Sequence, residues 1–379
     1  MRRILLLLAI ILAVATGCKN ETPEAPLLEL SESSMEVWFN EAEYTIQVNA
    51  SHHWSATSDS EWITIVNSEG NKGVSELKFS VSPNNSAEQR NGAITVQCKG
   101  ADLSASIAIA QSGVKSEYLE IAYESKDGKV VMPLKADAFG AAIISNTYEN
   151  GKGLICFDAP VTKVGEEAFC ECENLASISL PNSVSEVANW AFYGCIQLKS
   201  ITLSERTLRI GESAFAVCQK LASITIPASV EEIGDSAFFG CNGMSAIYGK
   251  FASEDNRCLI IDNELRHFAS KGVTEYSIPE YVTSICHDAF YESFRLKRVT
   301  IPASVQSIGD YAFYYCEVLE SVYCRPTTPP TLGVNVFDNF DGGDRPIGCK
   351  IYVSKESVDA YKAAENWSRY KQYIVGLDF

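Results

Sequence analysis

Apolar residues in the C-terminal half of the chain recur with a period of 23 residues. Six Ala-Phe pairs stand 23 residues apart, except for one interval of 52 residues. They end at Phe169, Phe192, Phe215, Phe238, Phe290 and Phe313. Counted from each Phe, position +6 is Leu or Met and position +9 is Ile or Val in all six copies. This pattern predicts tandem repeats over residues 160–324, stacked as a solenoid in which each turn buries its apolar face against the next.

Each repeat predicts one short strand followed by a return to the Ala-Phe pair. The apolar residues at +6, +9 and +11 mark the strand, and each Phe is expected to fill the core. Prolines are expected to end the strand, because proline cannot donate to the ladder. They are Pro181, Pro227, Pro279 and Pro302. Gly211, Gly234 and Gly309 are expected to allow the turn that follows.

The regions around the repeats have other patterns. Residues 28–113 alternate between apolar and polar positions in short runs such as Tyr44–Val48 and Ala93–Gln97, which is typical of a β-sandwich. Residues 114–159 and 325–379 are predicted to cap the two ends of the solenoid. The 52-residue interval between Phe238 and Phe290 predicts a hairpin insertion at about residues 248–275, turning at Asp262-Asn263. The expected fold is therefore mainly β.

The first residues predict export. Arg2 and Arg3 precede the apolar run Ile4–Val14, which is too short to span a bilayer. Ala15-Thr16-Gly17-Cys18 resembles a bacterial lipobox, which implies a signal peptide at 1–17, lipidation of Cys18 and a tether at 18–27. The protein is then expected to be anchored to the outer membrane of a Gram-negative bacterium, at the cell surface. Simple secretion is the alternative.

Composition limits the partners and the chemistry. The formal net charge of −17 argues against nucleic acid and against anionic membrane surfaces, so that the lipid is the expected membrane contact. Five of the thirteen cysteines occupy position +3 of the repeat, which predicts a column of buried free thiols rather than disulfides. The four histidines fit no hydrolase, metal or nucleotide motif. We therefore expect no catalytic residue, no metal and no cofactor, and a chain that is monomeric.

Aromatic residues supply the candidate binding positions. Those that follow the repeat Phe, together with outward positions of the strands, are Tyr193, Phe239, Tyr291, Tyr314, Tyr248, Arg298 and Tyr323. Aligned exposed rings often mark recognition surfaces, and the alternative is that they cover the edge of the ladder. Trp38, Trp54 and Trp62 are candidate platforms for sugars in the N-terminal module. The alternative for Trp54 and Trp62 is a place in the sandwich core.

Two resemblances follow from these patterns. The repeat I-G-x-x-A-F-x-x-C-x-x-L-x-x-I-x-I-P resembles the BspA-like leucine-rich repeat, type 5. Residues 28–113, with Trp54-Ser55-Ala56 and Ile107–Gly113, resemble the BACON domain, an immunoglobulin-like module of bacterial surface proteins. The repeats imply a non-enzymatic, adhesin-like surface lipoprotein that binds host or bacterial proteins or glycoproteins. The BACON resemblance implies the alternative of a glycan- or mucin-binding protein of a polysaccharide-uptake system.

Overall fold

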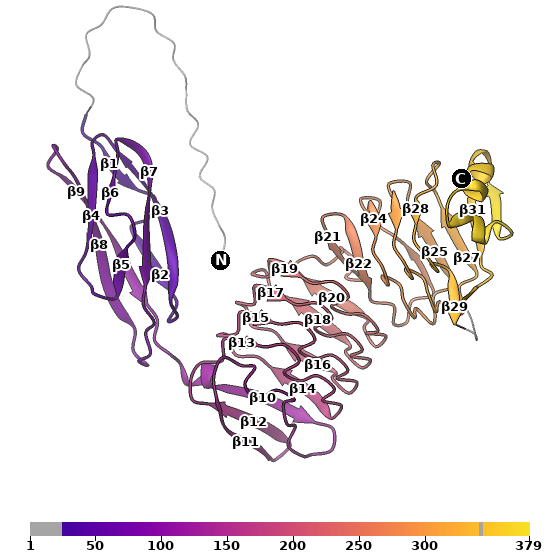
Figure 1. The fold of residues 1–379 in the computed structure, drawn as a ribbon, viewed down its shortest axis with the longest axis horizontal. Coiled ribbons are helices and arrows are strands. Elements are labelled where there is room, and N and C mark those ends of the chain that lie inside the picture. Colours follow the sequence, from indigo (N-terminus) through magenta and orange to yellow (C-terminus); the bar gives the residue numbers. More distant parts are fainter. Residues whose placement is uncertain (1–24, 341–343) are drawn as a thin grey trace, which may run out of the picture. The chain divides into compact units, whose positions relative to one another are not determined.

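The computed structural model describes residues 25–340 and 344–379. The chain divides into two compact units, Met1–Val114 and Lys115–Phe379 (Figure 1). The first unit has one hydrophobic core, and the second has two. The proposed signal peptide and Cys18 lie outside the described residues.

The first unit is a sandwich of two sheets. One sheet has the order β1 (Leu28–Leu30), β3 (Ala42–Ala50), β7 (Gly73–Val81) and β5 (Ile63–Ile65). The other has the order β2 (Ser34–Val37), β9 (Leu103–Gln111), β8 (Arg90–Cys98), β4 (Trp54–Ser58) and β6 (Glu69–Gly70). Alternate side chains of the long strands are buried, as the period-two pattern predicts, and Val48, Phe79 and Ile107 have no exposed surface.

The second unit is a β-solenoid of about 9 turns with 23-residue spacing, and the expected mainly β class is confirmed. Its first sheet runs through β11 (Ile143–Glu149), β12 (Lys152–Phe157), β10 (Glu120–Ser125), β14 (Leu175–Ser179) and β16 (Ser200–Thr202), after the short helix η1 (Ser116–Leu119). The pair β18 (Ser223–Ile226) and β20 (Ala246–Gly249) follows. A second, narrow sheet contains β13 (Lys163–Val164), β15 (Glu186–Val187), β17 (Arg209–Ile210) and β19 (Glu232–Ile233).

A second block repeats this plan towards the C-terminus (Figure 1). Its broad sheet contains β23 (Glu275–Ser277), β25 (Arg298–Ile301), β27 (Ser321–Cys324), β31 (Lys350–Ser354) and β32 (Ile374–Leu377). Its narrow sheet contains β21 (Cys258–Ile261), β22 (Glu264–Phe268), β24 (Ser284–Ile285), β26 (Ser307–Ile308) and β28 (Thr331–Leu332). The end carries β29 (Asp338–Phe340), β30 (Asp344–Pro346), η2 (Lys355–Ser357), α1 (Val358–Ala363) and η3 (Trp367–Tyr370).

The parallel strands pair in register with the sequence period. Ile178 faces Ile201, and Val299 faces Val322, each partner being 23 residues on. Equivalent inward residues therefore lie side by side in successive turns. Between the two blocks, β21 and β22 pair antiparallel as a hairpin that turns at Asp262 and Asn263.

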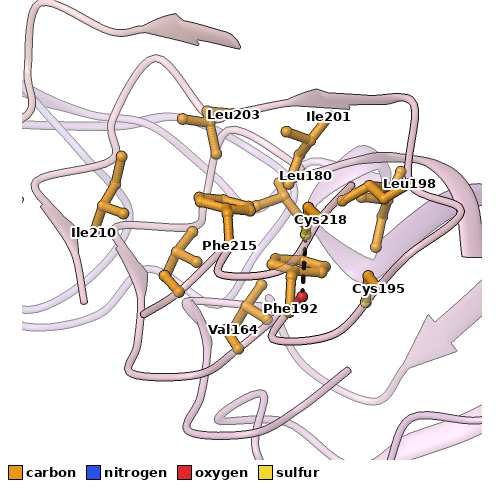
Figure 2. Packing of buried hydrophobic residues seen from close by; sticks show 14 of the residues in the cluster. Val164, Leu180, Phe192, Cys195, Leu198, Ile201, Leu203, Ile210, Phe215 and Cys218 are labelled. Atoms are coloured by element: carbon orange, nitrogen blue, oxygen red, sulfur yellow. Dashed lines mark hydrogen bonds between the residues drawn. The ribbon is translucent and has the colours of Figure 1, made fainter. Parts of the chain in front are cut away.

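The repeat Phe residues form a stacked column inside the solenoid. Phe169, Phe192, Phe215 and Phe238 stack with centroid distances of 5.3 to 5.6 Å and interplanar angles of 5 to 6°. Figure 2 shows the rings of Phe192 and Phe215 among aliphatic side chains from both sheets. Each fully buried ring contributes apolar area and a stacking contact, so the column explains why the Ala-Phe pair repeats.

The column is longer than the six expected plugs. Phe139 contacts Phe169 edge-on at 5.6 Å, and Phe337 stacks on Phe313 at 5.3 Å. Both rings are fully buried. Phe139 also ends an Ala-Phe pair, but it precedes Phe169 by 30 residues and therefore does not fit the 23-residue period.

The cysteine column is confirmed for the described residues, where all twelve cysteines are free thiols. Four thiols of the column are buried, and each donates its S–H, at 3.0 to 3.2 Å, to the carbonyl of the plug Phe in the preceding turn (Figure 2). They are Cys195, Cys218, Cys241 and Cys316. Cys172 is half-buried and donates to the Met132 carbonyl instead. A small thiol at +3 therefore fills space and satisfies a buried carbonyl.

The repeat glycines were expected to allow a turn, but the structure gives a different reason for them. Gly211, Gly234 and Gly309 do not have positive φ angles. A Cβ at these positions would lie 2.4 to 2.5 Å from a backbone nitrogen of the preceding turn. Close approach of adjacent turns therefore favours glycine at these three positions, although the Phe192 turn has Ala188 at the same place. The positive φ angles fall two residues before and two after the plug, as at Ser213 and Val217.

The unusual backbone of the Ala-Phe segment creates a second ladder between turns. The amide of Phe215 donates to the Ala237 carbonyl of the next turn at 2.8 Å. The amides of Ser213 and Val217 donate to Asp235 and Phe239 in the same direction. Every second amide around the plug thus bonds to the following turn, which ties successive turns together on the side opposite the broad sheet.

Candidate functional site

Three of the predicted aromatic residues form a continuous row on the Ala-Phe side of the solenoid. Phe239 contacts Tyr291 at a centroid distance of 4.6 Å, and Tyr291 stacks on Tyr314 at 6.0 Å. Tyr311 and Tyr315 meet Tyr314 edge-on at 5.3 and 5.2 Å. We call these five residues the aromatic row. Tyr193 does not belong to it, because the intervening turn carries Ala216 at the same repeat position.

The members of the row differ in exposure. Tyr314 is only 7% exposed, whereas Tyr311 is 37% exposed, and the others are intermediate. Burial, with Glu292 acting in the same direction, raises the pKa of Tyr291 to about 12. Tyr314 therefore mainly covers the ladder, and Tyr311 presents more of its ring to solvent. Sequence reasoning placed Tyr315 beside this row but missed Tyr311, whose signal is its place two residues before Phe313.

The outward face of the broad sheet holds the remaining candidates. Tyr248 on β20 is 44% exposed. On the second block, the Arg298 guanidinium lies 5.8 Å from the Tyr323 ring, and Tyr323 stacks on Tyr352 at 4.9 Å. Arg298 also pairs with Glu275 at 3.0 Å. Tyr352, on β31, extends this face and was missed, because it lies beyond the last Ala-Phe repeat.

A small cavity lies where the hairpin replaces a regular turn. Its volume is about 140 Å³, and it is lined by residues 234–239 and 286–288 and by Leu259, Glu264, Arg266 and His267. Arg266 donates to the Glu264 carboxylate at 3.2 Å and to the Ile233 carbonyl at 3.3 Å. No sequence motif marks this group of residues, because only the interruption of the repeat brings them together.

Burial shifts the ionisation of two residues at this cavity. It lowers the pKa of His267 to about 4, so that the imidazole is neutral near pH 7. It also raises the pKa of Asp288 to about 6, against a smaller opposite effect of His287. The cavity therefore combines a neutral imidazole, an arginine and three carboxylates, those of Asp235, Glu264 and Asp288.

The three tryptophans of the first unit have different surroundings. Trp54 has no exposed surface, and its Nε1 donates to the Ser75 hydroxyl at 2.9 Å. It is a core residue, so its assignment as a candidate glycan platform is wrong. Trp62 is partly exposed and carries the Arg90 guanidinium 4.5 Å from its ring centroid. Trp38 is also partly exposed, and its ring lies 5.5 Å from that of Phe39.

Metal-binding clusters and membrane-spanning helices are both absent from the described residues. No three His, Cys, Asp or Glu side chains in the described part of the chain are placed to hold a metal ion. No helix within residues 25–340 and 344–379 is long and apolar enough to cross a membrane.

Comparison with solved structures gives similar repeat proteins. A leucine rich cell surface protein from Faecalibacterium prausnitzii is 24% identical, with a TM-score of 0.39, over 56% of this chain and 66% of that one. A leucine-rich repeat protein from Bacteroides ovatus is 21% identical, with a TM-score of 0.30, over 62% of this chain and 72% of that one. A GH5 xyloglucanase from Bacteroides ovatus, in complex with a heptasaccharide, is 19% identical over 30% of this chain and 24% of that one, with a TM-score of 0.22. The match thus spans less than two thirds of the first and the third of these chains.

Family models describe both units. No curated protein matches the chain. The model of BACON, an N-terminal domain to which binding is ascribed, matches residues 52–112. The model of the BspA type leucine-rich repeat region matches six copies within residues 142–254 and 263–342, just over half of the chain. Together the two domains suggest a surface binding protein. The chain belongs to the family of proteins with a BspA type leucine-rich repeat region.

Proposed function

We propose that this chain is a non-enzymatic, lipid-anchored surface protein of a Gram-negative bacterium. Its solenoid binds a host or bacterial protein or glycoprotein in the manner of an adhesin. The N-terminal sandwich serves as a spacer or as an accessory contact. The expected lipid at Cys18 holds the protein in the outer membrane, and the binding unit acts as a monomer without a cofactor.

The observation that carries the proposal is the aromatic row. Five aromatic rings from two successive turns and from Phe239 lie in one series of contacts. Tyrosine supplies large contact area at low entropic cost and keeps a hydroxyl for hydrogen bonds, so it is enriched where proteins bind partners. The first block has no equivalent series, because its positions after Phe169, Phe192 and Phe215 are Cys170, Tyr193 and Ala216.

Surface plasmon resonance with the immobilised full chain tests this proposal. The probes are purified extracellular-matrix proteins and mucins, each in native and enzymatically deglycosylated form. The double variant Tyr311→Asn, Tyr315→Asn removes two rings and keeps the backbone, because both residues have positive φ angles that asparagine tolerates. We expect at least a roughly tenfold loss of affinity, as for residues that dominate an interface.

A matched control comes from the first block. Ser213→Asn and Val217→Asn place the same residue at the same two repeat positions, which also have positive φ angles. This control should bind like the parent. Equal binding by both double variants would contradict a role for the aromatic row, and a loss caused instead by Tyr323→Ala and Tyr352→Ala would move the contact to the broad sheet.

The alternative function is glycan or mucin binding by the N-terminal sandwich. It is favoured by the partly exposed rings of Trp38 and Trp62. Each unit has its own core, so the fragments 25–114 and 115–379 can be compared on a glycan array. Sugar binding confined to the N-terminal fragment, and abolished by Trp62→Ala, would support this alternative and contradict the solenoid as the main binding unit.

A further inference from the structure

The first sheet of the solenoid ends in an open strand edge. β11 is the outermost strand of this sheet and has only β12 as a neighbour among the described strands (Figure 1). The two strands are joined by the two-residue turn Asn150-Gly151, in which both residues have positive φ angles. In a hairpin with such a turn, the flanking residues Glu149 and Lys152 form a hydrogen-bonded pair.

This pair determines which backbone groups of β11 are unused. Bonding alternates along an antiparallel ladder, so Thr147 and Ser145 also bond to β12. Asn146 and Tyr148 lie between these residues and direct their N–H and C=O groups to the other side. Within the described part of the chain, these four groups have no backbone partner. They are available to a further strand.

Exposed apolar side chains lie beside this edge. The Asn146 side chain donates to the Val131 carbonyl at 2.9 Å and to the Met132 sulfur at 3.8 Å, which holds residues 130–134 alongside β11. Four apolar side chains of this region are 41 to 66% exposed, and we call them the apolar patch: Val130, Met132, Leu134 and Ile144. Grouped exposed apolar residues mark interaction surfaces.

The sequence of β11 lacks the features that normally block an open edge. Ile143–Glu149 contains no proline and no lysine, and its single charge is that of Glu149 at the turn. Isoleucine, threonine and tyrosine all favour the extended conformation. An edge of this kind accepts a further strand. Such a strand can bond to Asn146 and Tyr148 through its backbone and place alternate side chains on the apolar patch.

Charge and area indicate what the added strand is. A second copy of the chain would bring together two molecules that each carry a formal net charge of −17, so the copies repel each other. A stable interface between two folded proteins buries roughly 1,200–2,000 Å² in total. The seven residues of β11 offer an edge only about 23 Å long. A single extended segment matches this length, and a basic one is attracted by the acidic chain.

We propose that the edge of β11 binds an extended, uncharged or basic segment of a partner protein by β-strand addition. Apolar residues at alternate positions of this segment lie on the apolar patch. The residues between them lie beside the side chains of Ser145 and Thr147, on the opposite face. The site shares no residue with the aromatic row, and it rests on the proposed function only in taking the partner to be a protein.

Hydrogen exchange in the full chain, followed by amide NMR, tests this proposal. The probe is a short synthetic peptide in which threonine and valine alternate between terminal lysines. We expect the amides of Asn146 and Tyr148 to exchange at least roughly tenfold more slowly with the peptide bound, because they gain hydrogen bonds. The amide of Thr147 already bonds to β12, so it is the internal control and should change much less.

Two N-methylated peptides separate backbone pairing from apolar contact. One is methylated at every valine nitrogen and the other at every threonine nitrogen, so each lacks the donors of one edge only. One of the two should fail to bind, and the other should bind like the parent peptide.

A pair of double variants tests the apolar patch. Met132→Gln with Leu134→Gln removes two apolar contacts and keeps an acceptor for the Asn146 side chain, so peptide binding should weaken at least roughly fivefold. Leu208→Gln with Val334→Gln changes two exposed apolar residues elsewhere in the solenoid and should bind the peptide like the parent.

Three results would overturn the strand site. They are unchanged exchange at Asn146 and Tyr148, equal binding of both N-methylated peptides, and a dimer in sedimentation velocity in which these two amides are already protected. In the last case a second copy occupies the edge.

Other outcomes separate this site from the proposed function. Tyr311→Asn with Tyr315→Asn should bind the peptide like the parent. If the peptide binds as expected while no matrix protein or mucin does, the strand site stands and the adhesin-like function is contradicted. If a matrix protein binds while the peptide leaves both amides unchanged, only the strand site is wrong.

Discussion

Phe215 illustrates how one residue type serves the whole array. Its ring is fully buried and lies between those of Phe192 and Phe238, at 5.4 and 5.6 Å. Its carbonyl accepts the S–H of Cys241, and its amide donates to Ala237 of the next turn. The side chain therefore holds the column together across three turns, while the backbone of the same residue joins its own turn to the next.

Phe215→Ala should destabilise the solenoid by roughly 3–5 kcal/mol, because the deletion leaves a cavity between two stacked rings. Thermal unfolding followed by circular dichroism measures this as a lowered Tm. Tyr193→Ala, at the partly exposed position after Phe192, is the control and should change Tm much less. An unaltered Tm for Phe215→Ala would show that the ring is not a core plug.

The stability contribution of His267 depends on pH. Its folded pKa of about 4 lies below the ordinary value, so the chain takes up a proton on unfolding between these values. The stability that depends on the neutral imidazole is fully present above about pH 6.5 and is lost as the pH falls towards 4. Asp288, with a folded pKa of about 6, acts in the opposite sense and destabilises the fold as the pH rises.

The variant His267→Phe separates the pH effect of His267 from the opposite effect of Asp288. The variant should be more stable than the parent by roughly 1–3 kcal/mol, because it removes a buried nitrogen that has no hydrogen-bond partner among the described residues. Its advantage should grow as the pH falls from about 7 to about 4.5, because only the parent must keep an imidazole neutral. Tm measured for both proteins across this range checks the prediction, and a constant difference would contradict the assigned pKa shift.

The spacing of turns determines which small residues the Ala-Phe segment accepts. Four residues before the plug, Gly211, Gly234 and Gly309 face the backbone of the preceding turn with no room for a Cβ. In the turn after the hairpin the same position is Cys286, whose side chain lines the cavity instead. The Phe192 turn also departs from glycine, with Ala188 at this position, so a small side chain is tolerated in one regular turn.

Gly309→Ala should therefore lower the stability of the second block. The new Cβ would lie 2.5 Å from the His287 amide nitrogen, and separating the turns costs roughly 1–3 kcal/mol for overpacking of this kind. Cys286→Ala, at the same repeat position, is the matched control and should lower Tm less. Equal effects of the two substitutions would contradict close approach as the reason for glycine.

The protein as a whole combines two independently cored units with an acidic surface. The sandwich and the solenoid each bury their own apolar residues, and the solenoid begins with the antiparallel strands β10 to β12 and ends with α1, η3 and β32. Trp367 and Tyr370 pack on the last plug, Phe337, Tyr361 packs on Trp367, and all three are fully buried. Such caps protect the apolar end of a stack from water and from other chains.

The proposed lipid anchor is at Cys18, which lies outside the described residues. Cys18→Ala should abolish labelling with radioactive palmitate in cells and release the protein from the membrane fraction, because the acyl chains are attached to this thiol. Cys98→Ala, in the sandwich core, is the control and should keep the label. Undiminished labelling of the Cys18 variant would contradict the lipoprotein assignment and favour simple secretion.

The 23-residue period was enough to predict the solenoid, its plugs and its thiol column, because each of these depends on contacts between equivalent residues of successive turns. Local pattern also sufficed for the two-sheet character of residues 28–113. In both cases the spacing of apolar residues along the chain follows directly from the geometry of the element that buries them. The column nevertheless extends to Phe139 and Phe337, which stand at 30 and 24 residues from their neighbours.

Packing between turns decided the rest. It assigned the repeat glycines to close approach, buried Trp54 and Tyr314, and brought Tyr311 and Tyr352 into the candidate surfaces. It also created the cavity at the hairpin, where residues from three separate segments meet only because one turn departs from the repeat. Exposure and mutual distance are properties of neighbouring turns in space, so the 52-residue interval locates the interruption of the stack but does not say which side chains meet there.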